Sequence, residues 1–161
     1  MQQLEGFQYA EYLDINVGYY TIMLPPASQD MTTIVTEFGK FRYNRLHMGM
    51  CASRDILQAK LDELLGYIKG VKTHIHNIFV LIKNGFEKKI DHLSIIFSSL
   101  CFACLKVNAP KCSFGLNEVT YLCYVITRKG NKPDPRIFQG NMDLGQPPTT
   151  AESRALIGMV Q

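Results

Sequence analysis

Two short stretches of the chain end in polar side chains that could bind a metal ion together. Asp14 lies in an expected strand, Tyr12–Ile15. Further on, Lys72–Ile75 and Ile78–Ile82 have the β-branched and aromatic composition of strands, and the polar pair His76-Asn77 between them predicts a hairpin tip. Carboxylate, imidazole and amide groups are all metal ligands, and we expect the two tips to meet.

Histidine and cysteine spacing leaves two further interpretations open. His74 and His76 share a strand face, so with Asp14 they could form a site of two histidines and one carboxylate. Paired histidines on a strand are more often ordinary polar residues. Cys101 and Cys104 stand three apart near the end of an expected helix; without a second Cys or His pair at ligand spacing, buried thiols are the favoured interpretation.

Length and composition predict one folded domain. The 161 residues are 47% hydrophobic, enough to bury a core without cross-links. The longest apolar run, Ile90–Val107, contains Asp91, His92 and Lys106 and is too polar to span a bilayer, so no membrane segment is expected. An odd set of cysteines without regular spacing favours a reducing, intracellular setting, the cytoplasm or the nucleus. These cysteines are Cys51, Cys101, Cys104, Cys112 and Cys123.

The net charge of +3 is compatible with nucleic-acid binding but does not establish it. Ten basic residues could follow a phosphate backbone, yet they are spread over several expected elements and fit a solvated surface equally well. They are Lys69, Lys72, Lys83, Lys88, Lys89, Lys106, Lys111, Arg128, Lys129 and Lys132.

The remaining pattern predicts alternating strands and helices around the hairpin. Apolar residues at spacings of three and four predict amphipathic helices over Asp55–Gly70 and Glu87–Cys104. Strands are expected at Tyr19–Leu24 and Val119–Thr127, a turn at Ser113–Asn117, and a hairpin from Met31–Glu37 and Lys40–Arg45. Gly140–Pro148 is a Pro/Gly-rich connector, and Ala151–Val160 is expected to be a helix cut off at its end, as in a piece of a longer polypeptide.

Several of these segments, taken in order, resemble the reverse transcriptase of gypsy-type long-terminal-repeat retrotransposons. Each motif is weak alone, but their order and spacing match over nearly the whole chain. The matching segments are Leu13-Asp14-Ile15-Asn16-Val17-Gly18-Tyr19-Tyr20-Thr21-Ile22, Phe38-Gly39-Lys40-Phe41-Arg42-Tyr43, Leu46-His47-Met48-Gly49-Met50, Gln58, Asp91-His92-Leu93, Leu105-Lys106-Val107-Asn108-Ala109-Pro110-Lys111-Cys112, Tyr121-Leu122-Cys123-Tyr124, Lys132-Pro133-Asp134-Pro135 and Ala155-Leu156-Ile157-Gly158-Met159-Val160.

The resemblance implies an α+β fold, a polymerase palm-like antiparallel sheet packed by two helices with a partial fingers segment. It places partial fingers and palm in residues 1–130, and a connector with the start of a truncated C-terminal helix in residues 131–161. Most of the fingers and the thumb are absent, so a protein partner covering the surface left by these parts is expected. An RNA–DNA or DNA duplex is the nucleic-acid partner that the resemblance implies.

Site residues also follow from the resemblance. Asp14 matches the first metal-binding aspartate, and the remaining catalytic positions fall on His76 and Asn77. The residues implied to face a nucleotide are Ile15, Val17, Gly18, Tyr19, Met48, Gly49 and Lys111, and those of the primer grip are Leu122, Cys123 and Tyr124.

Departures from the family affect the chemistry directly. Where the family has two aspartates at the hairpin tip, this chain has His76 and Asn77, and prolines are replaced by His47 and Arg54. The family uses two Mg²⁺ ions, which prefer several oxygen ligands, and Asp14 supplies one carboxylate. We therefore predict no cofactor, weak or no metal binding at Asp14, and a degenerate domain without polymerase activity. The alternatives are a nucleic-acid-binding module that keeps the primer-template groove and an RNA-directed DNA polymerase with unusual metal use.

Overall fold

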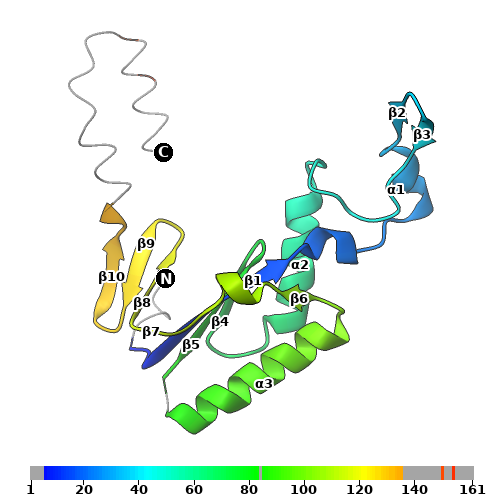
Figure 1. Cartoon of the computed structure of the whole chain (residues 1–161). Helices are drawn as coiled ribbons and strands as arrows, with labels where there is room; N and C mark the ends of the chain where they lie inside the picture. Colours follow the sequence, from blue (N-terminus) through cyan, green and yellow to red (C-terminus); the bar gives the residue numbers. More distant parts are fainter. Residues whose placement is uncertain (1–5, 84, 136–149, 151–153, 155–161) are drawn as a thin grey trace.

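The computed structural model describes residues 6–83, 85–135, 150 and 154, and combines antiparallel strands with helices (Figure 1). The strands are β1 (Tyr9–Asn16), β2 (Ile34–Thr36), β3 (Gly39–Phe41), β4 (Val71–His74), β5 (Asn77–Ile82), β6 (Lys106–Val107), β7 (Ser113–Leu116), β8 (Glu118–Tyr121), β9 (Tyr124–Thr127) and β10 (Gly130–Pro133). The helices are α1 (Pro26–Asp30), α2 (Ser53–Leu65) and α3 (Phe86–Phe102), with short 3₁₀ helices η1 (Gly18–Thr21) and η2 (Ala109–Lys111).

The main sheet has the order β4-β5-β1-β6, and β7 also pairs with β1. All of these pairings are antiparallel. In the register between β1 and β5, Leu13 lies opposite Ile78 and Asp14 lies opposite Asn77. The sheet therefore brings the end of β1 to the β4–β5 turn, as the sequence predicts.

One face of this sheet forms the main core with α2 and α3. Leu13 and Ile78 from the sheet are fully buried, as are Leu61 of α2 and Ile96 of α3. In α2 the buried residues recur every four positions, at Ser53, Leu57, Leu61 and Leu65, which is the spacing of one helix face. The predicted bounds of α3 and the predicted start of α2 lie within a few residues of the observed ones. The end of α2 differs more, because the helix ends at Leu65 and was predicted to continue to Gly70.

A buried ion pair links β1 to α3 within this core. Glu11 is 0% exposed and Lys89 is 8% exposed, and Lys89 Nζ lies 2.8 Å from Glu11 Oε1. The second carboxylate oxygen accepts a hydrogen bond from the Gly115 amide (2.7 Å). The expectation that Lys89 could contact phosphates is therefore wrong, because its charge is buried and paired.

The opposite face of the sheet carries a small second core and the three-stranded sheet β10-β9-β8. Val119 and Ile126 of that sheet pack with Ala10 and Phe79. Val119–Thr127 was predicted as one strand, which is wrong.

The chain turns between β8 and β9 because Leu122 (φ 45°) and Cys123 (φ 68°) adopt left-handed backbone angles, as both central residues of a tight hairpin turn do. Such angles are uncommon outside glycine, so composition gave no sign of this turn. Ser113–Asn117 was predicted as a turn, whereas β7 forms there because the free edge of β1 offers it a partner.

Residues between β1 and α2 form an arm that extends from the main sheet and carries β2 and β3 at its end (Figure 1). The predicted hairpin is present but shorter. The predicted strand Tyr19–Leu24 is wrong: Val17 adopts a left-handed φ of 53° and the Tyr20 amide donates to its carbonyl (3.1 Å), which starts η1 instead.

The predicted connector at Gly140–Pro148 and the helix at Ala151–Val160 lie outside the described residues. Among the helices that the structure describes, none is long and apolar enough to cross a membrane.

Candidate functional site

The two polar tips meet through the backbone. The Ile15 amide donates to the His76 carbonyl (2.7 Å), and the Asn108 amide donates to the Asp14 carbonyl (2.8 Å). The two-residue turn consists of Ile75 and His76, one position earlier than predicted, and Asn77 is the first residue of β5. Ile75 has a φ of 57°, a strained angle for a β-branched residue.

Asp14 is the one acidic side chain at this meeting point within the described residues. It is 5% exposed, and its Oδ2 lies 3.9 Å from His76 Nε2. Asn77 lies opposite Asp14 in the register, but its Oδ1 accepts a hydrogen bond from the Tyr12 hydroxyl (2.8 Å). The amide oxygen at the second catalytic position is thus already engaged within the sheet.

The side chains at the tip are poor ligands for two Mg²⁺ ions. Mg²⁺ requires near-octahedral oxygen coordination, whereas the tip offers one carboxylate, an imidazole and an engaged amide. In the described part of the chain, no three His, Cys, Asp or Glu side chains come together in a way that could hold a metal ion. His74, His76 and Asp14 of the alternative site are not brought together among the described residues. The His74 ring instead lies edge-on to Tyr121, with 6.3 Å between the ring centres.

A cavity of about 510 Å³ opens beside Asp14 and His76. It gathers most residues that the resemblance implies for nucleotide binding, from β1, η1, the loop before α2 and η2. The predicted residues in its lining are Asp14, Ile15, Val17, Gly18, Tyr19, Met48, His76 and Lys111. Asn16, Arg54, Ile75 and Asn108 complete the lining, and none of these four was assigned to the site from the sequence.

Five predicted site residues do not line this cavity, and one of them is Asn77, whose side chain is hydrogen-bonded to Tyr12. Gly49 follows Met48, and its amide donates to His47 Nδ1 (3.0 Å), so the imidazole that replaces proline closes this loop. Leu122, Cys123 and Tyr124 lie at the β8–β9 turn. The preceding residue, Tyr121, packs edge-on against Phe79 of β5, with 4.8 Å between the ring centres. This contact connects the turn to the central hairpin. The primer grip therefore stays a prediction.

Gln58 of α2 holds the strained turn in place. Its Oε1 accepts from the Ile75 amide (2.7 Å), and its Nε2 donates to Thr73 Oγ1 and Asp62 Oδ1 (2.9 Å each). Gln58 was one of the motif residues, but only the structure gives it this role, because Thr73 and Ile75 are 15 and 17 positions away.

Replacing Gln58 by alanine should lower the free energy of unfolding by about 1–3 kcal/mol, because the half-buried Ile75 amide loses its acceptor. Denaturant unfolding measures the loss. Lys60→Ala is the matched control on the same helix, since its ion pair with Glu63 is exposed, screened by water and adds little to stability. Equal stabilities of the two variants would contradict the role of Gln58.

Tyr12 carries the pKa shift nearest to the site. Burial, then the charges of Asp14 and Cys112, raise the pKa of Tyr12 above its ordinary value of 10.0. Burial and the charge of Asp62 raise that of Tyr121 likewise. A pKa that is higher in the folded than in the unfolded state means that the folded chain holds the tyrosine proton more tightly. This contribution to the free energy of unfolding is complete below the unfolded pKa and is lost as pH rises through the folded pKa.

The free energy of unfolding should therefore fall above about pH 10, and less steeply in Tyr12→Phe, which has no hydroxyl to ionise. Denaturant unfolding at several alkaline pH values measures both slopes. Tyr67→Phe, at an exposed position, is the control and should keep the slope of the unmodified chain. An unchanged slope in Tyr12→Phe would contradict this assignment.

The cysteines and the predicted basic residues are distributed as follows. Cys101 and Cys104 are exposed free thiols, so the prediction that they are buried is wrong; they face outward near the end of α3.

Lys111 lines the site cavity. Four other lysines border a separate cavity of about 560 Å³ at the far end of β5, and these are Lys69, Lys72, Lys83 and Lys88.

Comparisons with known proteins show what the chain is similar to. No protein-family model matches the chain. It is similar to the retrovirus-related Pol polyprotein from transposon opus of Drosophila melanogaster, with 24% identity over 160 residues, covering 99% of this chain and 16% of that protein. The Drosophila transposon 412 polyprotein is 28% identical over 139 residues, covering 86% of this chain and 11% of that protein. The chain spans 11–16% of the length of these relatives.

Solved structures of similar fold come from foamy virus. The foamy viral protease–reverse transcriptase in complex with double-stranded DNA matches with a TM-score of 0.82 and 22% identity, over 95% of this chain and 32% of that one. Its complex with an RNA/DNA hybrid matches with a TM-score of 0.78 and 22% identity, over 97% of this chain and 21% of that one. The chain is thus similar in sequence to retroelement Pol polyproteins, and its fold is similar to that of part of the foamy viral protease–reverse transcriptase.

Proposed function

We propose that the chain is the palm, with part of the fingers, of a reverse-transcriptase-like domain that no longer polymerises DNA. The observation that carries this proposal is the side-chain set where β1 meets the β4–β5 turn. Asp14 is accompanied there by His76 at 3.9 Å and by Asn77, whose oxygen is hydrogen-bonded to Tyr12.

The expected loss of rate follows from the missing charges. Two-metal polymerisation needs carboxylates that hold both ions close to the reacting phosphate. If each missing carboxylate costs about 3 kcal/mol of transition-state stabilisation, the rate falls by roughly 10⁴-fold. The remaining carboxylate also lies against an imidazole, whose nitrogen suits zinc or copper better than magnesium.

Primer extension on an RNA–DNA primer-template tests the proposal, with Mg²⁺ and with Mn²⁺ in separate reactions. We expect no extension above the level of a protein-free reaction in either. Extension with Mn²⁺ would favour the alternative of a polymerase with unusual metal use. Extension with Mg²⁺ that is lost in Asp14→Asn would overturn the proposal.

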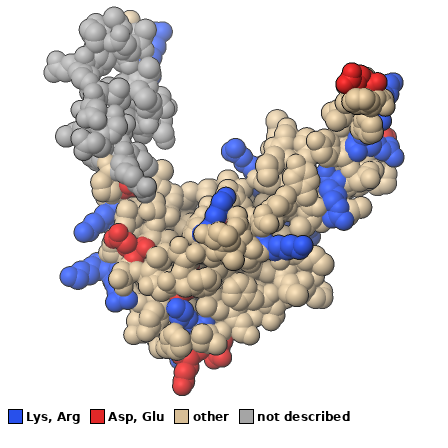
Figure 2. Space-filling model, viewed as in Figure 1, with Lys and Arg blue, Asp and Glu red and all other residues tan. Residues whose placement is uncertain are grey.

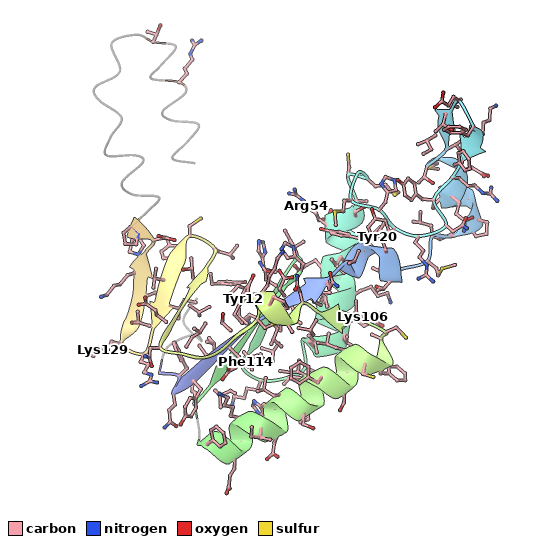
Figure 3. The ribbon with its side chains drawn as sticks, in the orientation of Figure 1. Tyr12, Tyr20, Arg54, Lys106, Phe114 and Lys129 are labelled. Carbon is pink, nitrogen blue, oxygen red and sulfur yellow. The ribbon has the colours of Figure 1, made fainter. Side chains whose placement is uncertain are left out.

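A second proposed role is a nucleic-acid platform that keeps the groove without the chemistry. Figure 2 shows a hollow between the β8–β10 sheet and the arm, with basic side chains standing in and around it. Arg54 and Lys106 project from α2 and β6 in this region (Figure 3), and Lys111 lines the cavity below. The similar foamy viral proteins were solved with duplex DNA and with an RNA/DNA hybrid, which supports the same role here.

Binding to a labelled primer-template at low and high salt tests this platform. We expect affinity to fall steeply with salt, because each released counterion adds to the slope. Lys106→Gln should reduce the slope by about one unit, whereas Lys129→Gln, at the outer β9–β10 turn, should leave it unchanged. Binding that does not depend on salt would contradict a phosphate-tracking groove.

A protein partner remains part of the proposal. Large apolar side chains are exposed around a cavity of about 850 Å³ between α2 and α3, where Tyr67 is 71% and Phe102 is 89% exposed. Further apolar exposure lies on the arm, at Val35 and Phe38. Large exposed apolar patches often mark protein–protein contact sites, which supports contact with further polypeptide.

A further inference from the structure

The C-terminal end of α3 holds two cysteines close together. The Cys104 amide donates to the Cys101 carbonyl (3.0 Å). The next amide, of Leu105, donates to the Leu100 carbonyl (2.9 Å). This pair of hydrogen bonds is a Schellman motif, in which the residue just beyond the helix has left-handed backbone angles, and Cys104 has a φ of 56°. A turn closed in this way keeps the Cα atoms of Cys101 and Cys104 within about 7 Å of each other.

Glycine is the usual residue at this left-handed position, because a β-carbon is disfavoured there. This chain has a cysteine instead, and both thiols of the segment Cys101-Phe102-Ala103-Cys104 are free and exposed. Two cysteines separated by two residues have the spacing at which proteins bind a zinc ion. The turn therefore presents half of a four-thiolate metal site to the solvent.

The position at the end of a helix favours a metal ion over a reactive dithiol. Redox-active Cys-x-x-Cys pairs gain from thiolates stabilised at a helix N-terminus, where the helix dipole is positive. Cys101 and Cys104 lie at the opposite end, where the partial negative charge of α3 attracts a cation. A divalent ion there compensates both the helix end and the thiolates that bind it.

One chain cannot complete such a site. Structural zinc is almost always bound by four ligands in tetrahedral geometry. Within the part of the chain that the structure describes, no third His, Cys, Asp or Glu side chain joins the two cysteines. A second copy supplies the other pair if the two helix ends meet around a two-fold axis, because such an interface brings the same residues of both copies together.

The surface around the two thiols suits contact with a second copy. Phe102 lies between them in the sequence and is 89% exposed, the highest value among the large apolar residues that the structure describes. The end of α3 lies at the edge of the molecule, on the side away from the β8–β10 sheet (Figure 1). Two copies that meet there remove both Phe102 rings from water.

We propose that Cys101 and Cys104 of two copies of this chain bind one zinc ion through four thiolates, and that the ion joins the copies as a dimer. Each thiol releases its proton to the solvent when it binds, and no electron is transferred. The inference rests on the proposed contact with further polypeptide and deepens it by naming the partner, a second copy of the chain.

Titration of the reduced full chain with Co²⁺, a coloured substitute for Zn²⁺, reads the ligand set directly. We expect the absorption of tetrahedral, thiolate-bound Co²⁺, saturating at one ion per two chains and lost when Zn²⁺ displaces the cobalt. Analytical ultracentrifugation should show dimers with Zn²⁺ and monomers with a chelator. The dimer dissociation constant should be at least about 100-fold lower with the ion.

Single substitutions assign the signal to the two cysteines. Cys101→Ser and Cys104→Gly should each abolish the thiolate absorption and the dimer formed with Zn²⁺. Cys104→Gly separates the loss of a ligand from damage to the fold, because glycine relieves the left-handed angle and should not lower the thermal unfolding temperature. Cys51→Ser and Cys123→Ser are the matched controls, since each removes an exposed thiol elsewhere and should keep both signals.

No thiolate-bound Co²⁺, saturation at one ion per chain, or a dimer that Cys101→Ser leaves intact overturns the inference. A monomer at every Zn²⁺ concentration overturns it too, without bearing on contact with a different polypeptide. These outcomes differ from a failure of the proposed loss of polymerisation, which is read from primer extension.

Discussion

Replacing Lys89 by methionine is expected to lower the free energy of unfolding by about 3–5 kcal/mol, because Glu11 is left as a buried carboxylate without its cation. The Lys89 ammonium lies 2.8 Å from Glu11 Oε1 and over the rings of Tyr9 and Phe86, 5.2 and 5.7 Å from their centres. The Gly115 amide satisfies only the second oxygen. Losing the ammonium therefore removes both an ion pair and cation–π contacts.

Denaturant unfolding of three variants measures this effect. Lys88→Met, at the exposed neighbouring position, is the matched control and should change stability by less than about 0.5 kcal/mol. The double variant Lys89→Met with Glu11→Gln should recover part of the loss, because no buried charge then remains. A Lys89→Met variant as stable as Lys88→Met would show that the buried pair does not hold β1 and α3 together.

Restoring both carboxylates, His76→Asp with Asn77→Asp, is expected to raise the affinity for Mn²⁺ by at least about 100-fold. Position 77 lies opposite Asp14 in the register, and the side chain at position 76 reaches Asp14, with His76 Nε2 3.9 Å from Asp14 Oδ2, so three carboxylates would converge. Without metal their mutual repulsion should cost about 1–3 kcal/mol of stability, and bound Mn²⁺ should return it.

Thermal unfolding of this double variant with and without Mn²⁺ measures both effects. The matched control is His92→Asp with Asn117→Asp, which adds the same number of carboxylates on α3 and between β7 and β8, away from the hairpin tip. Stabilisation by Mn²⁺ in the control as well would indicate nonspecific binding. An unstabilised restored variant would mean that Arg54 or His47 also prevents metal binding.

The local pattern of the sequence predicts the central hairpin and the two long helices. β4 and β5 differ from the expected strands by a residue at each tip, because β-branched composition and short length leave few alternatives. The buried positions of α2 follow from the spacing of Leu57, Leu61 and Leu65. These features depend on neighbours in sequence, so pattern alone suffices.

The errors arise where distant contacts or unusual backbone angles decide. The β8–β9 turn rests on left-handed Leu122 and Cys123, and no glycine marks it. Lys89 and Glu11 are 78 positions apart, so only the fold pairs them. Arg54 was recognised as a departure from the family, but that it lines the cavity with Lys111 depends on the packing of α2 against η1.

Electron paramagnetic resonance of Mn²⁺ titrated into the unmodified chain tests the absence of a two-metal centre most directly, because bound and free Mn²⁺ give different signals. The side chains around Asp14 predict no saturable binding of two ions per chain, and a spectrum that Asp14→Asn leaves unchanged. Two saturable Mn²⁺ ions per chain, lost in Asp14→Asn, would contradict the account.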